Sequence, residues 1–122
     1  MENKTVLVVD DSMTDFLYVS NILVKNGYQV VHAQSGKDAI EEARRVHPDC
    51  ILMDVVMPEM NGFQATRLIS REATTSDIPI IMLSSKAQKT DKVWAQRQGA
   101  TGYLVKPIES QRLVSALKRV LN

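Results

Sequence analysis

Five short apolar runs alternate along the chain with longer segments in which apolar residues recur every three or four positions. The runs cover residues 5–9, 29–33, 50–53, 78–83 and 103–105. In the runs at 5–9, 50–53 and 78–83, apolar residues follow one another instead of alternating with polar ones. Continuous runs of this kind are typical of strands buried on both faces, as in a parallel sheet covered by helices.

The longer segments predict helices. The segment 113–121 places apolar residues at 113, 116, 117, 120 and 121, which form one stripe on a helix. Ser35 is a predicted N-cap with Asp38 in the capping-box position, and this helix ends before Pro48. We expect further helices over 16–25, with Gly27 as C-cap, over 62–71 and over 88–98.

The alternation of strands and helices predicts an α/β fold of the (βα)5 type. Right-handed crossovers between parallel strands then produce an open, doubly wound sheet with helices on both faces. Such sheets bind ligands beyond the carboxyl ends of their strands, where the direction of winding changes. The residues that directly follow each strand are therefore the first candidates for a functional site.

Polar side chains follow four of the five predicted strands. The first strand is followed by Asp10 and Asp11, the third by Asp54, the fourth by Ser84, and the fifth by Lys106. The fold brings these positions to one edge of the sheet. Three carboxylates held together repel one another and raise each other's pKa. A hard cation offsets that repulsion, and Mg²⁺ suits a few carboxylates, water and a phosphate.

Each of these residue types meets a need of phosphoryl transfer to a carboxylate. Asp54 is the natural nucleophile, because a carboxylate can form an aspartyl phosphate. Lys106 supplies positive charge to the transferring group, and the hydroxyl of Ser84 can donate to a phosphate oxygen. Taken singly, each residue is more often a turn or cap residue. Their coincidence at four strand ends favours a site.

Composition narrows the class of protein. The 122 residues are 44% hydrophobic and 24% charged, with a net charge of +1, and we expect a single soluble domain. No basic stripe suggests nucleic-acid binding, and no apolar stretch approaches the roughly 18 residues of a membrane span. The single cysteine, Cys50, fits a reducing, cytoplasmic location. His32 and His47 lack metal-ligand spacing and are interpreted as solvated or loop histidines.

Three motifs resemble those of response-regulator receiver domains with the CheY-like, or flavodoxin-like, fold. They are Val8-Val9-Asp10-Asp11-Ser12, Met53-Asp54-Val55-Val56-Met57-Pro58 with Gly62 four residues on, and Tyr103-Leu104-Val105-Lys106-Pro107. They occur in the family's order over essentially the whole chain. The resemblance implies the strand order 2-1-3-4-5 and a receiver domain spanning residues 1–122 with no output domain.

The resemblance also implies roles for individual residues. Asp54 is phosphorylated by a partner histidine kinase, and Lys106, in a cis bond to Pro107, contacts the phosphoryl group. Ser84 and Tyr103 form the switch pair. The implied Mg²⁺ ligands are the carboxylates of Asp10, Asp11 and Asp54 and the backbone carbonyl of Val56.

The family binds its partners on the face formed by the fourth helix, fifth strand and fifth helix, which here includes Trp94 and Tyr103. The alternative interpretation is that Trp94 only packs along its own helix. We expect a monomer or a weak dimer, no nucleic-acid partner and no membrane insertion.

The chain departs from the commonest pattern of the family at Ser84 and at Lys86, where an acidic residue is frequent. Ser84 stands where threonine is usual, which keeps the hydroxyl donor. Val56, two residues after the phosphoacceptor, cannot orient a hydrolytic water, so we predict slow self-dephosphorylation. Beyond this self-phosphorylation and self-dephosphorylation, the chain is not expected to be an enzyme.

Residues 61–67 and 90–100 resemble receivers of pilus-associated chemosensory systems, the PilH-like group. This implies a CheA-type kinase and a role in type IV pilus twitching motility. Two roles stay open: a signalling output through protein contacts, or a phosphate sink for a shared kinase. A phosphohydrolase of the haloacid dehalogenase type needs an aspartate at the position of Val56. A flavin-binding domain would need a phosphate loop in place of Asp10-Asp11-Ser12.

Overall fold

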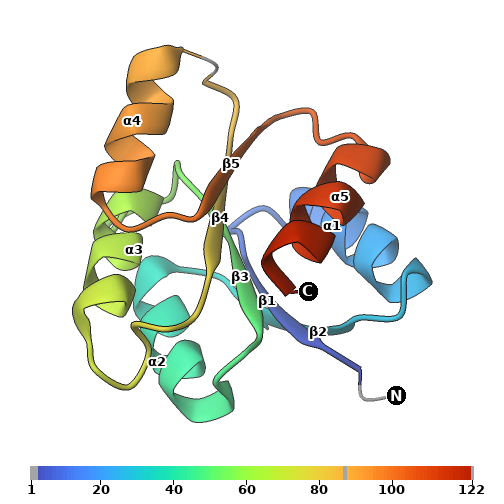
Figure 1. Ribbon diagram of the computed structural model, residues 1–122, viewed down its shortest axis with the longest axis horizontal. Coiled ribbons are helices and arrows are strands. Elements are labelled where there is room, and N and C mark those ends of the chain that lie inside the picture. Colours follow the sequence, from blue (N-terminus) through green and yellow to red (C-terminus); the bar gives the residue numbers. More distant parts are fainter. Residues whose placement is uncertain (1–2, 87, 122) are drawn as a thin grey trace.

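A five-stranded sheet runs through the centre of the protein and carries helices on both faces (Figure 1). The computed structural model describes residues 3–86 and 88–121. The strands are β1 (Thr5–Val9), β2 (Gln29–Ala33), β3 (Cys50–Asp54), β4 (Ile80–Ser84) and β5 (Gly102–Val105). The helices are α1 (Met13–Lys25), α2 (Gly36–Val46), α3 (Gly62–Arg71), α4 (Lys89–Arg97) and α5 (Ser110–Leu121).

The strand order is β2-β1-β3-β4-β5 and every pair is parallel, which confirms the predicted fold and order. From β1 the chain winds outward to β2 and then returns to β3 on the other side. The direction of winding therefore changes between β1 and β3. Their register pairs Val9 with Met53, so the next residues, Asp10 and Asp54, leave adjacent strands at the same edge.

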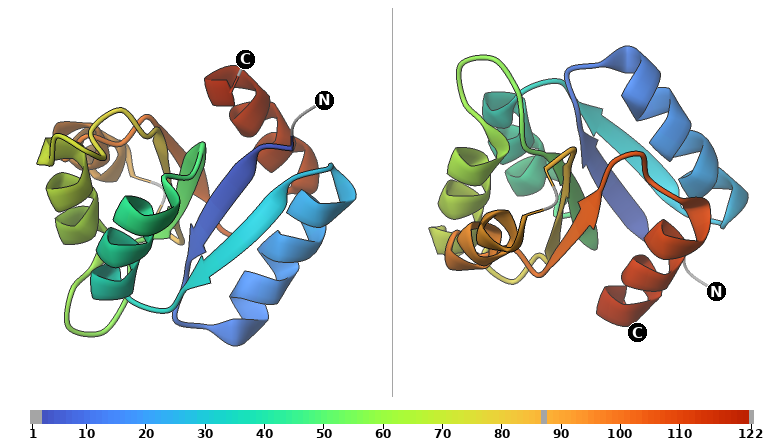
Figure 2. Two further views of the ribbon diagram at one scale, coloured as in Figure 1. Left: turned by 90° about the horizontal axis from the view of Figure 1, so that it is seen from below. Right: turned by 90° about the horizontal axis from the view of Figure 1, so that it is seen from above.

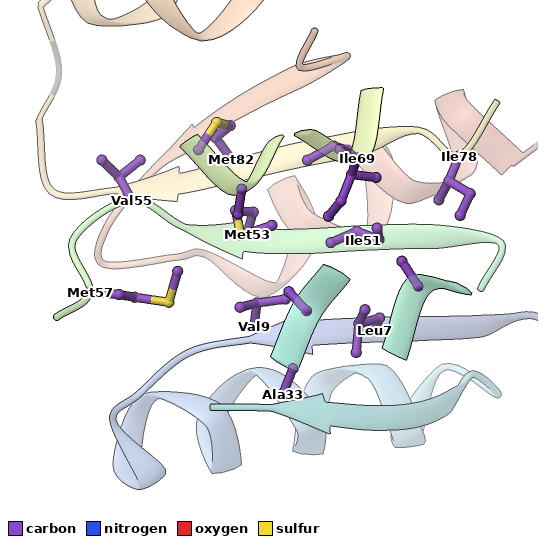
Figure 3. Close-up of a cluster of buried hydrophobic side chains, with 14 of the residues drawn as sticks. Leu7, Val9, Ala33, Ile51, Met53, Val55, Met57, Ile69, Ile78 and Met82 are labelled. Atoms are coloured by element: carbon purple, nitrogen blue, oxygen red, sulfur yellow. The ribbon is translucent and has the colours of Figure 1, made fainter. Parts of the chain in front are cut away.

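The helices divide into two layers because side chains on each strand point alternately to opposite faces (Figure 2). On β1, Leu7 and Val9 belong to the core beneath α2, α3 and α4 (Figure 3). Val6 and Val8 belong to the other core, beneath α1 and α5. The continuous apolar runs in the sequence therefore supply two cores at once.

Local capping explains where the helices begin and end. Ser35 caps α2 as predicted, its Oγ accepting a hydrogen bond of 3.1 Å from the backbone N–H of Asp38. Helix α1 starts three residues before the predicted position 16. The Oγ of Ser12 accepts from the Asp15 N–H at 3.3 Å, so the helix begins at Met13. This early start places a further carboxylate, Asp15, on the first turn.

Several other boundaries differ from the prediction by one or two residues, among them those of β4 and α4. Strand β4 begins at Ile80 instead of residue 78, directly after Pro79, which has no N–H to donate to a ladder. Helix α4 is one residue shorter at each end than predicted, and Gln88 and Gln98 are its caps. No helix in the described ranges is long and apolar enough to cross a membrane.

Candidate functional site

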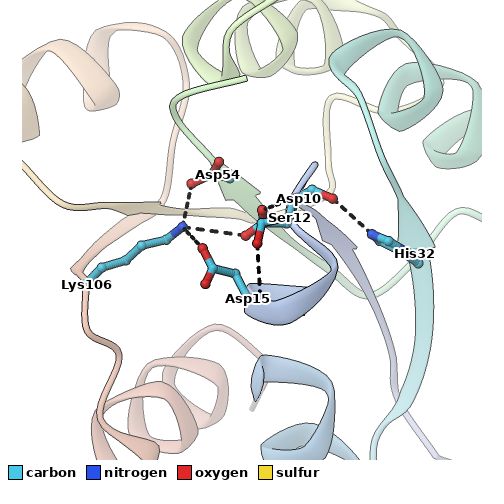
Figure 4. Close-up of polar contacts among 6 residues, drawn as sticks. All are labelled: Asp10, Ser12, Asp15, His32, Asp54 and Lys106. Carbon is cyan, nitrogen blue, oxygen red and sulfur yellow. Dashed lines mark hydrogen bonds and ion pairs between the residues drawn. The ribbon is translucent and has the colours of Figure 1, made fainter. Parts of the chain in front are cut away.

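The carboxyl ends of β1, β3 and β5 bring Asp10, Asp54 and Lys106 together (Figure 4). The Nζ of Lys106 lies 2.8 Å from Asp54 Oδ1 and 3.5 Å from Asp10 Oδ2. Both carboxylates are buried, with 2% of Asp10 and 6% of Asp54 exposed, whereas Asp11 is exposed. Three of the predicted strand-end residues, Asp10, Asp54 and Lys106, are therefore in contact.

The backbone at Asp54 is held by the start of α3. The N–H of Gly62 donates to the carbonyl of Val55 at 2.8 Å. A Cβ at residue 62 would overlap the carbonyl oxygen of Asp54 and would lie only 2.9 Å from Val55 Cα. Only glycine allows this approach, so the first residue of α3 fixes the loop that follows the carboxylate.

Lys106 is positioned through β4 and through the bond that follows it. Its backbone N–H donates to the carbonyl of Ser84 at 2.7 Å, which continues the pairing of β5 with β4. The Lys106–Pro107 peptide bond is cis, as expected. Ser84 is itself buried, and its Oγ accepts a hydrogen bond of 3.1 Å from the Lys86 N–H. Lys106 and Ser84 thus lie at the ends of adjacent strands.

Burial governs the ionisation of the two buried carboxyl groups. It raises the pKa of Asp54 above its ordinary value, and the hydrogen bond from Lys106 only partly opposes this. Burial likewise raises the pKa of Asp10, against the hydrogen bond that Asp10 accepts from the Ser12 N–H. For Lys106, burial acts to lower the pKa, but the hydrogen bond and charge of Asp54 outweigh it, and the pKa is raised. The two buried carboxyl groups thus share one lysine, whose charge only partly offsets the cost of burying them.

A hard divalent cation fits this donor set. One carboxylate oxygen from each of Asp10, Asp11 and Asp54 lies within 4.8 Å of the others. Oxygen donors at such spacing suit a small cation that keeps part of its water shell. Three carboxylates contact the single lysine, and a cation would neutralise the negative charge that this lysine does not offset. The set can therefore hold a divalent ion beside the Asp54 oxygens.

The predicted partner residues divide between two surface hollows. Tyr103 is half-buried and its hydroxyl donates to the carbonyl of Lys86 at 2.8 Å; it lines a hollow shared with Lys92. Trp94 is half-exposed and lines a different hollow, with Val93 and Lys89. The two aromatic residues thus belong to separate parts of the surface around α4.

The structure adds one carboxylate that the sequence prediction missed. The Oδ2 of Asp15 lies 3.2 Å from Lys106 Nζ, so this lysine contacts three carboxylates (Figure 4). The signal was present in the sequence, because Ser12 and Asp15 have the spacing of an N-cap and the third helical residue. With Ser12 as the N-cap, Asp15 is the third residue of α1 and lies on its first turn.

The interpretation of His32 as a solvated or loop residue is wrong. His32 lies in β2 and is half-buried, with its ring stacked on Phe16 at 3.7 Å between centroids. Its Nε2 lies 3.0 Å from the carbonyl oxygen of Asp10. Spacing along the sequence could not show this, because the contact exists only once β2 lies beside β1.

A mostly apolar hollow of about 510 Å³ opens beside the site between α1 and the segment after β5. Asp10, Asp15 and Lys106 line one part of it, and Tyr18 and Ile108 line another. The hydroxyl of Tyr18 donates to the carbonyl of Ile108 at 2.6 Å, which ties α1 to that segment. Met13 and Leu17, on the same helix, are about half exposed.

Comparison with known proteins agrees with this arrangement. The protein PilH of Pseudomonas aeruginosa is 47% identical over 116 residues, which are 95% of this chain and 96% of that protein. The chemotaxis protein CheY4 of Vibrio cholerae superposes with a TM-score of 0.92 at 36% identity, covering 98% of this chain and 100% of that one.

A receiver domain of a sensor histidine kinase from Pseudomonas aeruginosa superposes with a TM-score of 0.90 at 30% identity, covering 98% of both chains. That structure has a magnesium ion coordinated in its active-site cleft. The family model of the response regulator receiver domain matches residues 6–118 of the present chain. With its sheet order and its cluster of strand-end residues, the chain belongs to the response regulator receiver domain family.

Proposed function

We propose that this protein is a phosphorylation switch that accepts a phosphoryl group on Asp54 in a Mg²⁺-dependent reaction. Receiver domains are signalling domains and not conventional enzymes. The observation that carries the proposal is the position of the Asp54 carboxylate. One of its oxygens is 2.8 Å from the lysine, and the carboxylate lies within metal-ligating reach of two further aspartates.

The chemistry follows from these neighbours. An oxygen of Asp54 attacks phosphorus as the nitrogen–phosphorus bond of the donor's phosphohistidine breaks, and the imidazole that leaves is protonated. Lys106 contacts a phosphoryl oxygen, and Ser84 donates its hydroxyl to another. The carboxylates of Asp10, Asp11 and Asp54 and the carbonyl of Val56 would hold Mg²⁺, which would offset the negative charge of the incoming phosphoryl group.

The switch itself requires a second conformation of the region around α4. Phosphorylation adds about −1.5 to −2 charge beside the buried carboxylates. Contacts from Lys106 and Ser84 stabilise that charge, and they must do so more strongly in one conformer than in the other. We propose that Ser84 and Tyr103 couple the phosphate to the surface, because the Lys86 N–H donates to the Ser84 hydroxyl and the Lys86 carbonyl accepts from the Tyr103 hydroxyl.

The predicted upstream and downstream partners have separate support. The 47% identity to PilH supports a CheA-type kinase and a role in type IV pilus twitching motility. The apolar hollow beside Lys106 and the half-exposed Met13 and Leu17 on α1 support docking of the kinase on this side of the site. For the downstream protein, we propose the surface of α4, β5 and α5. A cytoplasmic location, a single domain and a monomer or weak dimer stay predictions.

Phosphotransfer from a purified CheA-type kinase with labelled phosphate tests the proposal. Wild-type protein should become labelled in the presence of Mg²⁺ and should not become labelled when EDTA removes the Mg²⁺. Asp54→Ala should not be labelled. Asp38→Ala removes an exposed carboxylate from the first turn of α2 and should be labelled like the wild type. Equal labelling of Asp54→Ala and wild type would contradict the assignment.

A second role, that of a phosphate sink, gives a different result in the same assay. A sink drains label from a kinase shared with another receiver, and it binds no target in a phosphorylation-dependent manner. A pull-down with and without beryllofluoride and Mg²⁺ separates the two roles. A phosphohydrolase of the haloacid dehalogenase type would release phosphate in many turnovers, which the apolar side chain of Val56 does not support.

A further inference from the structure

His32 reaches the acidic site from β2, a strand that contributes no carboxylate to it (Figure 4). Its ring stacks on Phe16 of α1 with an angle of 13° between the planes, and its Nε2 lies 3.0 Å from the carbonyl oxygen of Asp10. A carbonyl oxygen only accepts hydrogen bonds, so the ring nitrogen carries the hydrogen and donates. The stacking fixes the plane of the ring and thereby aims that donor.

This hydrogen bond completes a set that holds Asp10. The backbone N–H of Asp10 donates to the carbonyl of Ala33 at 3.1 Å, and its Oδ1 accepts from the Ser12 N–H at 2.9 Å. With the bond from His32 to its carbonyl oxygen, Asp10 is held on both sides of its Cα and at its side chain. The residue is also almost completely buried.

The consequence reaches the next residue through the peptide plane. The carbonyl of Asp10 and the nitrogen and Cα of Asp11 lie in one rigid plane. Fixing the Asp10 oxygen therefore fixes the direction in which Asp11 leaves the strand. Asp11 is exposed, and its carboxylate oxygen nevertheless lies within 4.8 Å of ligand atoms on Asp10 and Asp54. The orientation of this peptide decides whether both carboxylates face the same point.

We propose that His32 is a positioning residue of the divalent-cation site. Its Nε2–H holds the Asp10–Asp11 peptide in the orientation that directs the two carboxylates to one cation. The inference rests on the proposed function in so far as that function includes Mg²⁺ binding by these aspartates. His32 itself contacts no substrate and no cation.

Two substitutions separate this role from simple packing of β2 against α1. His32→Phe keeps an aromatic ring that can stack on Phe16 and removes the donor. His32→Gln loses the ring but keeps an N–H donor at nearly the reach of Nε2. The matched control is His47→Phe, a change at the other histidine, which is exposed and contacts Asp77 at 3.2 Å.

The test is titration calorimetry with Mg²⁺, together with the melting temperature of each variant in EDTA. We expect His32→Phe to weaken Mg²⁺ binding about tenfold, the lower end of what loss of an outer hydrogen-bond partner costs a metal site. His32→Gln should bind Mg²⁺ within about threefold of wild type, even where its melting temperature is the lower of the two. His47→Phe should bind like wild type.

Three outcomes would overturn the inference, and the third of them would also contradict the Mg²⁺ site of the proposed function. Wild-type affinity in His32→Phe would show that the donor is not needed. Binding by His32→Gln no tighter than by His32→Phe would show that the ring, and hence packing alone, matters. Wild-type protein that binds no Mg²⁺ would contradict the proposed cation site itself, and the role of His32 with it.

Discussion

At the scale of single residues, the charge balance around Lys106 is the main property of the site. Its Nζ contacts Asp54, Asp15 and Asp10 at 2.8, 3.2 and 3.5 Å. Asp15 is half-exposed and can keep its contact with the lysine from the solvent side. When Asp54 carries a phosphoryl group, Asp15 is therefore in a position to hold Lys106 near the new oxygens.

Val56 sets the expected lifetime of the phosphorylated state. Its side chain is 65% exposed two residues after Asp54 and offers no group that could orient a water. We expect Val56→Asn to shorten the half-life of the aspartyl phosphate by about fivefold, well below the effect of a full general base. The loss of label from purified phosphorylated protein measures it.

The control for this prediction is Val56→Ala, which opens space but adds no hydrogen-bonding group. Its half-life should stay within about twofold of wild type, since access alone does not orient water. Equal half-lives for wild type and Val56→Asn would show that residue 56 does not limit hydrolysis.

At the scale of elements, each site residue depends on a helix or strand that begins or ends at a fixed place. The boundaries of β1, β2 and α3 were predicted to the residue, because apolar runs and glycines mark them. The start of α1 was missed, because the Ser12 cap was not recognised. Because the predicted helix start was three residues too late, Asp15 was not placed on α1 and its contact with Lys106 was not predicted.

Gly62 tests how tightly α3 determines the site. In Gly62→Ala the new Cβ meets the backbone of Asp54 and Val55, which cannot rotate away as a side chain could. We expect a loss of about 1–3 kcal/mol in the free energy of unfolding, as for other overpacked sites. The folded fraction should also accept phosphate more slowly from a small phosphodonor. Urea denaturation and a labelling time course give the two values.

Gly102→Ala is the matched control on β5. Its new Cβ would be 3.4 Å from a side-chain atom of Ile81, an ordinary contact. This variant should keep the wild-type labelling rate. Labelling of Gly62→Ala at the wild-type rate would mean that the Asp54 loop does not depend on the close approach of α3.

At the scale of the whole molecule, the winding of the sheet gathers negative charge at one edge. This charge lowers the free energy of unfolding. Burial raises the pKa of Asp10 and Asp54. A carboxyl group with a raised pKa in the folded state contributes stability below its unfolded pKa. That contribution is lost as the pH rises through the folded pKa. At neutral pH, without a cation, these two groups therefore destabilise the fold.

Asp54→Asn removes one of these charges with almost no change of shape. In EDTA at pH 7 we expect this variant to melt several degrees above wild type, and the difference should close as the pH falls toward the ordinary aspartate pKa of 3.8. Mg²⁺ should raise the melting temperature of wild type at pH 7 more than that of the variant. Calorimetric scans between pH 4 and 8, with and without Mg²⁺, measure both effects. A wild type that is the more stable protein at pH 7 in EDTA would contradict this account.

The sequence alone determined the five strands, the five helices and the identity of the residues at the strand ends. It could do so because burial on both faces of a parallel sheet leaves continuous apolar runs, and because strand ends of one sheet must meet at one edge. Tertiary structure alone decided the neighbours of those residues. Asp15 meets Lys106, and His32 meets the Asp10 carbonyl, only after α1 lies against the segment that follows β5 and β2 pairs with β1. Contacts between elements distant in the chain leave no periodic pattern, so the sequence indicated where a site forms, and the packing determined how it is held.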